Sequence, residues 1–150
     1  MRVFHGLDDV RGAVGQQLGV SDWHLITQEQ VNLFADATGD HQWIHVDPER
    51  AAAGPFGAPI AHGFLTLSMV PMLLWQVFTI EGVSMMVNYG LNKVRFPSPM
   101  KVGSRMRGRF TLLGVERHPD CVQSTWKMTV EQEGSDKPVC VAESVLRRYY

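Results

Sequence analysis

The segment from Phe64 to Ile80 constrains the fold of this chain most strongly, because its 17 residues include no charged side chain. Its length is at the lower limit of a membrane-spanning helix, and Ser68, Pro71 and Gln76 interrupt its apolar character. A buried helix from about His62 to Phe78, with a kink or break at Pro71, is the better interpretation. A helix that is apolar on all sides must be enclosed by other elements, so the rest of the chain is expected to cover it.

The second half of the chain alternates between apolar and polar residues, and this pattern predicts β-strands. In the segment after Cys121, for example, every second residue from Val122 to Val130 is expected to face the same side. Short turns between the segments favour antiparallel pairing. A sheet wrapped around the apolar helix gives an α+β fold. The expected strands are Val83–Tyr89, Lys93–Phe96, Ser104–Val115, Cys121–Glu133 and Val139–Arg148.

The first half contains signals for helix ends. Thr27 and Gln30 match a capping box, and Gly39 has the position of a residue that follows a helix C-terminus. Asp47 and Pro48 suit the N-cap and first position of a short helix that runs through Ala53. Two further short elements are expected: a helix over residues 8–18 that stops at Gly19, and a strand over Trp23–Ile26.

Composition restricts the possible functions. The 150 residues are expected to form a single domain, residues 1–150, and the apolar content of 45% is ordinary for a globular protein. A net charge of −1 predicts no broad surface for nucleic acid or anionic membranes. The N-terminal sequence MRVFHGLDDVRG has no long apolar run, so a cytoplasmic location is expected. Cys121 and Cys140 are predicted to lie too far apart to bond, and to be reduced.

Two short segments carry the candidate chemistry. The stretch GDHQWIH places Asp40 and His45 five residues apart, directly after the predicted helix end at Gly39. The stretch PIAHG ends at Gly63, where the apolar helix begins and backbone N–H groups are free. Each segment alone is a weak signal. Together they offer an acid, a base and a donor for a developing negative charge.

These segments carry a resemblance to a known family. Residues 34–51, FADATGDHQWIHVDPERA, resemble the hydratase-2 motif of the MaoC-like (R)-specific enoyl-CoA hydratases, and PIAHGF resembles the segment that opens the family's central helix. The family commonly has Asn-Pro where this chain has Gln42-Trp43, and this variant looks more like the NodN-type branch. The resemblance runs from about Thr27 to the C-terminus. It implies the hot-dog fold, in which an antiparallel sheet wraps around one long central helix.

The resemblance also implies an activity in fatty-acid metabolism: reversible addition of water to trans-2-enoyl-CoA, giving (R)-3-hydroxyacyl-CoA. Asp40 and His45 are the expected catalytic pair, which activates water and returns a proton to C2. The Gly63 N–H is expected to polarise the thioester carbonyl. Supporting or substrate-binding residues are expected to be Gly39, His62, Asn88 and Arg95. The family works without metal or other cofactor, and a homodimer is expected.

Several alternatives compete with this interpretation. A thioesterase of the same fold would share the substrate class, but such enzymes usually carry their carboxylate on the central helix, and no Asp or Glu occurs between Phe64 and Ile80. A non-catalytic acyl-thioester binder would not require both Asp40 and His45. The histidines around Asp40 match no metal-ligand spacing. Three arginines on one strand could meet the phosphates of coenzyme A, although a solvated outer face explains them more simply: Arg105, Arg107 and Arg109.

Overall fold

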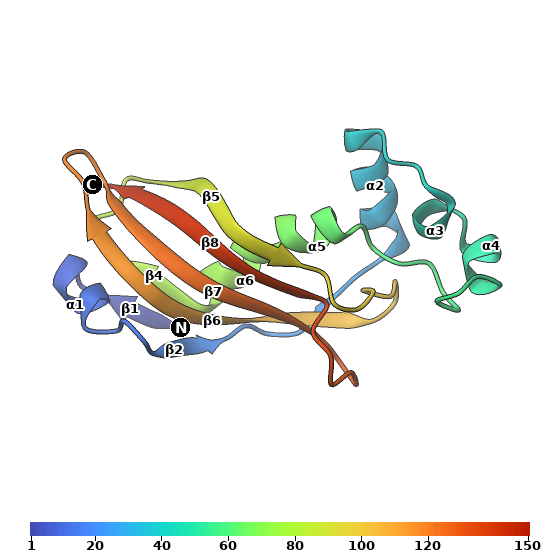
Figure 1. Ribbon diagram of the computed structural model, residues 1–150, viewed down its shortest axis with the longest axis horizontal. Coiled ribbons are helices and arrows are strands. Elements are labelled where there is room, and N and C mark those ends of the chain that lie inside the picture. Colours follow the sequence, from blue (N-terminus) through green and yellow to red (C-terminus); the bar gives the residue numbers. More distant parts are fainter.

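A curved antiparallel sheet packs against two short helices that follow each other along its concave side (Figure 1). The computed structural model describes residues 1–150, and the α+β prediction is confirmed. The strand order is β2-β6-β7-β8-β5, and β3 pairs with β6 beside β2. The bounds are β2 Gln17–Val20, β3 His24–Leu25, β5 Met85–Arg95, β6 Arg105–Arg117, β7 Val122–Gln132 and β8 Cys140–Tyr149.

The central apolar segment forms two helices, and the kink or break expected at Pro71 is present close to that residue. Helix α5 spans Gly63–Ser68 and α6 spans Val70–Val77, with the break at Met69. Pro71 has no N–H to donate to the carbonyl four residues earlier, so the hydrogen-bond ladder is interrupted there. None of the helices is long and apolar enough to cross a membrane.

The sheet covers the central helices on one side only. Their buried residues include Leu65, Leu73 and Val77, which belong to the core. Phe64 and Trp75 on the other side are 72% and 63% exposed. The expectation that this segment is enclosed on all sides is therefore wrong for a single chain, because a sheet with one packed face can bury only the stripe that lies on it.

Strand β5 is continuous where two strands, Val83–Tyr89 and Lys93–Phe96, were expected. Its pairing with β8 shifts twice, leaving Tyr89 and Asn92 as extra residues in β-bulges. Each bulge moves the following residues to the opposite face, and paired residues on neighbouring strands share a face. The residues of β5 that face the helices are therefore Met86, Asn88, Leu91 and Val94.

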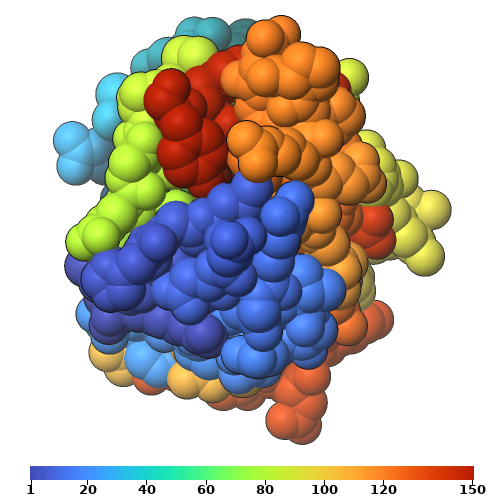
Figure 2. All heavy atoms as spheres, turned by 90° about the vertical axis from the view of Figure 1, so that its left-hand side faces the viewer, coloured from blue at the N-terminus to red at the C-terminus, as the bar shows by residue number.

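The N-terminal residues cover one end of the core (Figure 2). Strand β1, Arg2–Phe4, pairs in parallel with β4, Phe78–Ile80, and α1 spans only Leu7–Arg11. The helix expected over residues 8–18 is thus wrong in its second half. Gly19 does not end a helix but lies in β2, where an added Cβ would come within 2.8 Å of Val77.

Three helices gather at the opposite end of the sheet (Figure 1). Helix α2, Gln28–Thr38, has the predicted capping box between Thr27 and Gln30. Helix α4, Pro48–Ala52, has the predicted N-cap, since Asp47 accepts a hydrogen bond from the Arg50 N–H. The one-turn helix α3, Trp43–Val46, was not expected, because four residues carry too little periodicity to be recognised.

The core is one cluster of 23 buried residues that runs from Phe4 to Leu146. The predicted alternation along β7 is confirmed, since each of its inward residues from Val122 to Val130 is buried.

Arg148 is an unexpected member of the interior. It is buried on the concave side, stacks on Phe78 and Trp126, donates to the Ser124 hydroxyl and forms no ion pair.

Candidate active site

Asp40 follows directly on the C-terminus of α2. Gly39 adopts a left-handed conformation with φ of 79°, which lets the chain turn away from the helix axis. The Asp40 side chain is 54% exposed, and its Oδ1 accepts a 3.4 Å hydrogen bond from the Gln42 N–H. The predicted end of α2 thus places the Asp40 carboxylate where water and substrate can reach it.

His45 is buried, and its backbone is fixed on both sides. The Gln28 side chain donates to its carbonyl oxygen at 2.7 Å, and its own N–H bonds to the Gln42 carbonyl oxygen. The His45 Nδ1 lies 2.7 Å from the carbonyl oxygen of Ile60. A carbonyl oxygen only accepts, so the proton is on Nδ1 and the Nε2 lone pair is free.

Burial lowers the pKa of His45 from its usual 6.5. The hydrogen bond to Ile60 and the charge of Asp40 act in the opposite direction, while His62 lowers the pKa further. The neutral imidazole therefore dominates at pH 7. A neutral ring with a free Nε2 can accept a proton from water.

His62 holds the two segments of the site together. Its ring stacks on that of His45, with centroids 3.8 Å apart and planes at 25°. Its Nε2 lies 2.9 Å from the carbonyl oxygen of Asp40, and its Nδ1 is buried without a partner. These contacts join the segment that carries His62 to both Asp40 and His45, so the role of His62 is to position those two residues.

Asp40, His45 and His62 are also the residues that come closest to a metal-binding group. One ligand atom from each lies within 4.8 Å of the others. The imidazole lone pairs lie in the ring planes, and two nearly parallel stacked rings direct these lone pairs side by side. A single ion cannot lie along both directions, so this arrangement does not suit metal binding.

Gly63 begins α5 beside a cavity of about 350 Å³ that His45, Thr66 and Phe96 also line. The Gly63 N–H has no partner in the first helical turn and makes no hydrogen bond elsewhere. An added Cβ at Gly63 would lie 3.1 Å from the Phe96 ring. The absence of a side chain therefore keeps the approach to this N–H open.

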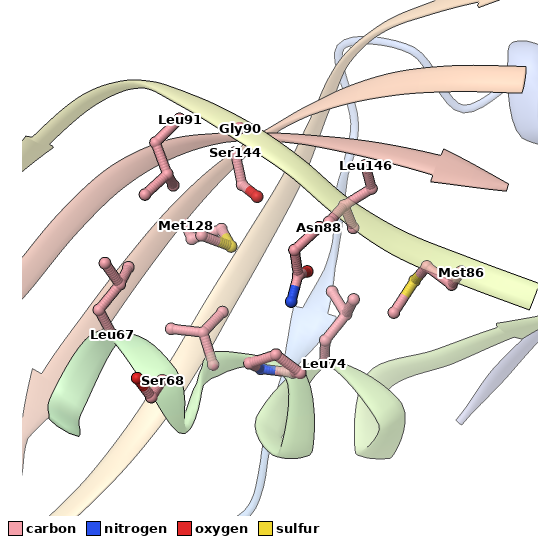
Figure 3. Close-up of a pocket in the computed structure, with 12 residues that line it drawn as sticks. Leu67, Ser68, Leu74, Met86, Asn88, Gly90, Leu91, Met128, Ser144 and Leu146 are labelled. Atoms are coloured by element: carbon pink, nitrogen blue, oxygen red, sulfur yellow. The ribbon is translucent and has the colours of Figure 1, made fainter. Parts of the chain in front are cut away.

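A second cavity of about 360 Å³ lies between the central helices and strands β5, β7 and β8 (Figure 3). Its lining is mostly apolar and includes Leu67, Val70 and Leu74. These three residues continue the helical stripe that begins at Gly63, with spacings of four, three and four residues. The second cavity thus lies farther along the same side of the helices than Gly63, which lines only the first cavity.

Of the other predicted site residues, Asn88 lines a cavity and Arg95 does not. Asn88 faces the second cavity, as a substrate-binding residue would. Arg95 lines neither cavity, and its side chain bonds only to the neighbouring Val94 carbonyl oxygen. The expectation that Arg95 belongs to the site has no support within the single chain.

The three arginines of β6 lie on the outer face of the sheet and are paired there. Arg105 bonds to Glu133, while Arg107 and Arg109 both bond to Glu131. These ion pairs fit the interpretation of a solvated outer face.

The Ile60 carbonyl oxygen, which fixes the His45 ring, was not predicted from the sequence. Every residue has a backbone carbonyl group, so the residue type gives no sign of this role.

Together, the fold and this site define a hydro-lyase: a sheet around central helices, with a carboxylate, a neutral histidine and a free backbone N–H at one end. The family description "MaoC like domain" matches residues 9–134, and the chain belongs to this family. The expected hot-dog fold and hydratase family are confirmed.

Individual relatives agree with this assignment. The chain is 62% identical over 148 residues to 3-hydroxyacyl-thioester dehydratase Z of Mycobacterium tuberculosis, covering 98% of each chain. It is 48% identical over 139 residues to Nodulation protein N of Rhizobium leguminosarum bv. viciae, covering 91% of this chain and 86% of that protein. The structure of R-hydratase PhaJ1 from Pseudomonas aeruginosa superposes with a TM-score of 0.67 at 25% identity, covering 91% and 81% of the two chains.

Proposed function

We propose that the protein catalyses the reversible, (R)-specific addition of water to trans-2-enoyl thioesters of coenzyme A. The observation that carries this proposal is the fixed tautomer of His45, whose ring belongs to a cluster with the Asp40 carboxylate and His62. The (R) stereochemistry and the thioester substrate are taken from the names of the related dehydratase and R-hydratase.

In the hydration direction, water attacks C3 while His45 and Asp40 remove its proton and deliver a proton to C2. The pair shares these transfers because both groups can reach one bound water. Negative charge grows on the thioester oxygen during attack, and the Gly63 N–H donates a hydrogen bond to it.

The acyl chain is proposed to extend from Gly63 into the second cavity along the stripe of Leu67, Val70 and Leu74. A mostly apolar cavity of this size stabilises a buried hydrocarbon chain by removing it from water. The coenzyme A part would remain outside, beyond the first cavity.

A thioesterase is less well supported. Hydrolysis of the C–S bond would require a nucleophile or base at the carbonyl carbon, and helices α5 and α6 carry no carboxylate. Ser68 is no substitute, because its hydroxyl donates to the Phe64 carbonyl oxygen and no base contacts it. A purely binding protein would gain nothing from the fixed tautomer of His45.

A homodimer joined at the β5 edge is part of the proposal. Strand β5 is the free edge of the sheet, and it exposes several large apolar residues: Met85, Val87, Tyr89 and Leu91. Phe64 and Trp75 are exposed on the helices. An unpaired apolar edge invites pairing with another strand, and a second copy would cover these residues.

The whole chain is proposed to act as one domain, since one core cluster draws residues from Phe4 to Leu146. A cytoplasmic location stays a prediction from the sequence.

The test is to follow the absorbance of the enoyl-thioester band with crotonyl-CoA and a longer trans-2-enoyl-CoA, together with thiol release. We expect the band to disappear without thiol release, and chiral analysis of the product to give the (R) isomer. Asp40→Asn and His45→Gln should remain folded and lose activity by at least about a hundredfold. Thiol release would instead establish a thioesterase, and full activity in both variants would exclude the proposed pair.

A further inference from the structure

The second cavity contains two polar side chains that have no partner in the protein. Asn88 on β5 and Ser144 on β8 both line it, and neither side chain makes a hydrogen bond. Figure 3 shows the Asn88 amide and the Ser144 hydroxyl directed from the sheet toward the helices. Ser68, the third polar lining residue, already donates to the Phe64 carbonyl oxygen.

Unpartnered polar groups are costly beside an apolar ligand. The rest of the lining is hydrophobic apart from backbone, with residues such as Met86, Met128 and Leu146 around the two polar groups. Ser144 is buried, at 6% exposed, whereas Asn88 is exposed in the single chain. A plain hydrocarbon chain in this cavity would displace water from the Ser144 hydroxyl and return no hydrogen bond, which costs about 1–3 kcal/mol for a buried group and less for the exposed Asn88 amide. A cavity for unsubstituted chains would be better lined by apolar side chains alone.

The two groups are close enough to act on the same part of a ligand. Asn88 lies opposite Leu146, and Ser144 is two residues from Leu146 on the same strand. Such diagonal neighbours have Cβ atoms about 7 Å apart, so an amide and a hydroxyl can reach one oxygen or two adjacent ones. The amide donates and accepts, and the hydroxyl does both as well.

Position along the helices separates these groups from the reaction centre. Leu67, the first helical residue of the cavity, is one turn beyond Gly63, about 6 Å along the axis. Asn88 and Ser144 line the second cavity only, and Gly63 lines the first only. With the thioester oxygen at the Gly63 N–H, as proposed above, an oxygen atom bound by Asn88 and Ser144 would belong to the part of the acyl chain beyond the reacting carbons.

We propose that the preferred substrates carry an oxygen function, a hydroxyl or a carbonyl, on the acyl chain beyond the reacting carbons, and that Asn88 and Ser144 bind it. This inference rests on the proposed function for the placement of the thioester. Asn88 and Ser144 are specificity-determining residues in this scheme and take no part in proton transfer.

The experiment compares trans-2-decenoyl-CoA with isomers that carry one hydroxyl at successive carbons between C4 and the chain end. We expect at least one isomer to be hydrated with a kcat/KM about tenfold above that of the plain chain, as one or two hydrogen bonds supply. Asn88→Leu, which keeps the side-chain size, and Ser144→Ala should each reduce this preference, measured as the ratio of the two kcat/KM values, about fivefold.

The matched control is Asn92→Leu. Asn92 is on the same strand but belongs to a bulge and bonds to Glu143 outside the cavity, so its replacement should leave the preference unchanged. A wild-type enzyme that hydrates the plain chain as well as every hydroxylated isomer would overturn the inference while leaving the proposed function intact. A preference for one hydroxylated isomer that is unchanged in both Asn88→Leu and Ser144→Ala would also overturn the inference.

Binding separates the two proposals when no hydration occurs. Calorimetric titration of wild type with decanoyl-CoA and its hydroxylated isomers measures the preference without any reaction. Tighter binding of one isomer, lost in Asn88→Leu, would support the inference even if the chemistry proposed above is wrong. Equal binding of all these thioesters, or no binding of any, would reject it.

Discussion

At the scale of single residues, the site depends on where one proton lies. The Ile60 carbonyl oxygen holds it on Nδ1 of His45, and burial lowers the pKa of the ring, so Nε2 is available at neutral pH. The stacked His62 ring fixes the plane of the imidazole. Asp40 and Gly63, by contrast, are set by the backbone at two helix ends.

The lowered pKa of His45 leads to a pH prediction. As pH falls below 6.5, kcat/KM should stay constant until it passes through the lowered pKa, where His45 takes up a proton and cannot act as a base. The unfolded chain binds this proton at higher pH than the folded chain does. The free energy of unfolding should therefore fall as pH drops from 6.5 to the lowered pKa. A kcat/KM profile with parallel unfolding curves checks both effects, and an acid limb above 6.5 would contradict the assignment.

Arg148 gives a second prediction at this scale. Burial lowers its pKa to about 10, well below the usual value for an arginine, so the folded state disfavours the charge that it carries at pH 7. The unfolded chain keeps this proton up to higher pH, so the contribution of Arg148 to the free energy of unfolding is expected to rise as pH increases above 10.

Replacement of Arg148 by Met should remove the cost of the buried charge and retain an unbranched stem against Phe78 and Trp126. We expect the urea-unfolding free energy at pH 7 to rise by about 1 kcal/mol or stay level. Arg148→Ala, which also loses the packing, should be less stable than Arg148→Met. A clear loss in the Met variant would mean that stacking and the bond to Ser124 outweigh desolvation.

At the scale of elements, the sequence correctly predicted the helix ends that particular side chains mark. The capping box at Thr27, the turn at Gly39 and the N-cap at Asp47 all formed as expected, because each depends on local hydrogen bonds. The break at Met69 lies two residues before Pro71, the residue that marked it in the sequence. The bulges at Tyr89 and Asn92 depend on how β5 pairs with β8, and hydrophobic periodicity cannot reveal them, since a bulge changes its phase without changing composition.

The end of α2 can be tested with a change confined to the backbone. Gly39 has φ of 79°, and an added Cβ would meet nothing within 4 Å, so Gly39→Ala introduces conformational strain without a clash. We expect a loss of about 1 kcal/mol in unfolding free energy and a lower kcat, because Asp40 follows directly. Gly39→Asn is the control, since Asn tolerates this conformation. Equal losses in both variants would argue against backbone strain.

At the scale of the whole molecule, a single chain leaves its helices covered on one side and its β5 edge unpaired. The sequence predicted that the sheet encloses the apolar helix, but the sheet of one chain covers only one side of it. The exposed residues Phe64 and Trp75 fit the idea that a second copy completes the enclosure.

Val87→Lys tests that assembly. Val87 is 39% exposed on the free edge, where a lysine opposes strand pairing. We expect light scattering after size exclusion to give a dimer for wild type and a monomer for the variant. Leu113→Lys is the control, because Leu113 is 40% exposed but lies in a bulge of β6, away from the β5 edge. A wild-type monomer, or a variant that remains dimeric, would refute pairing through β5.

The two bulges of β5 also have a consequence for how such enzymes diversify. They determine which residues of the strand face the second cavity. A one-residue insertion or deletion at a bulge would turn Met86, Asn88 or Leu91 away from the cavity and turn the adjacent residues toward it. Because the proposed catalytic groups lie on other elements, the chemistry would be retained. A short change in length at this edge is therefore a route to a new substrate range in a single evolutionary step.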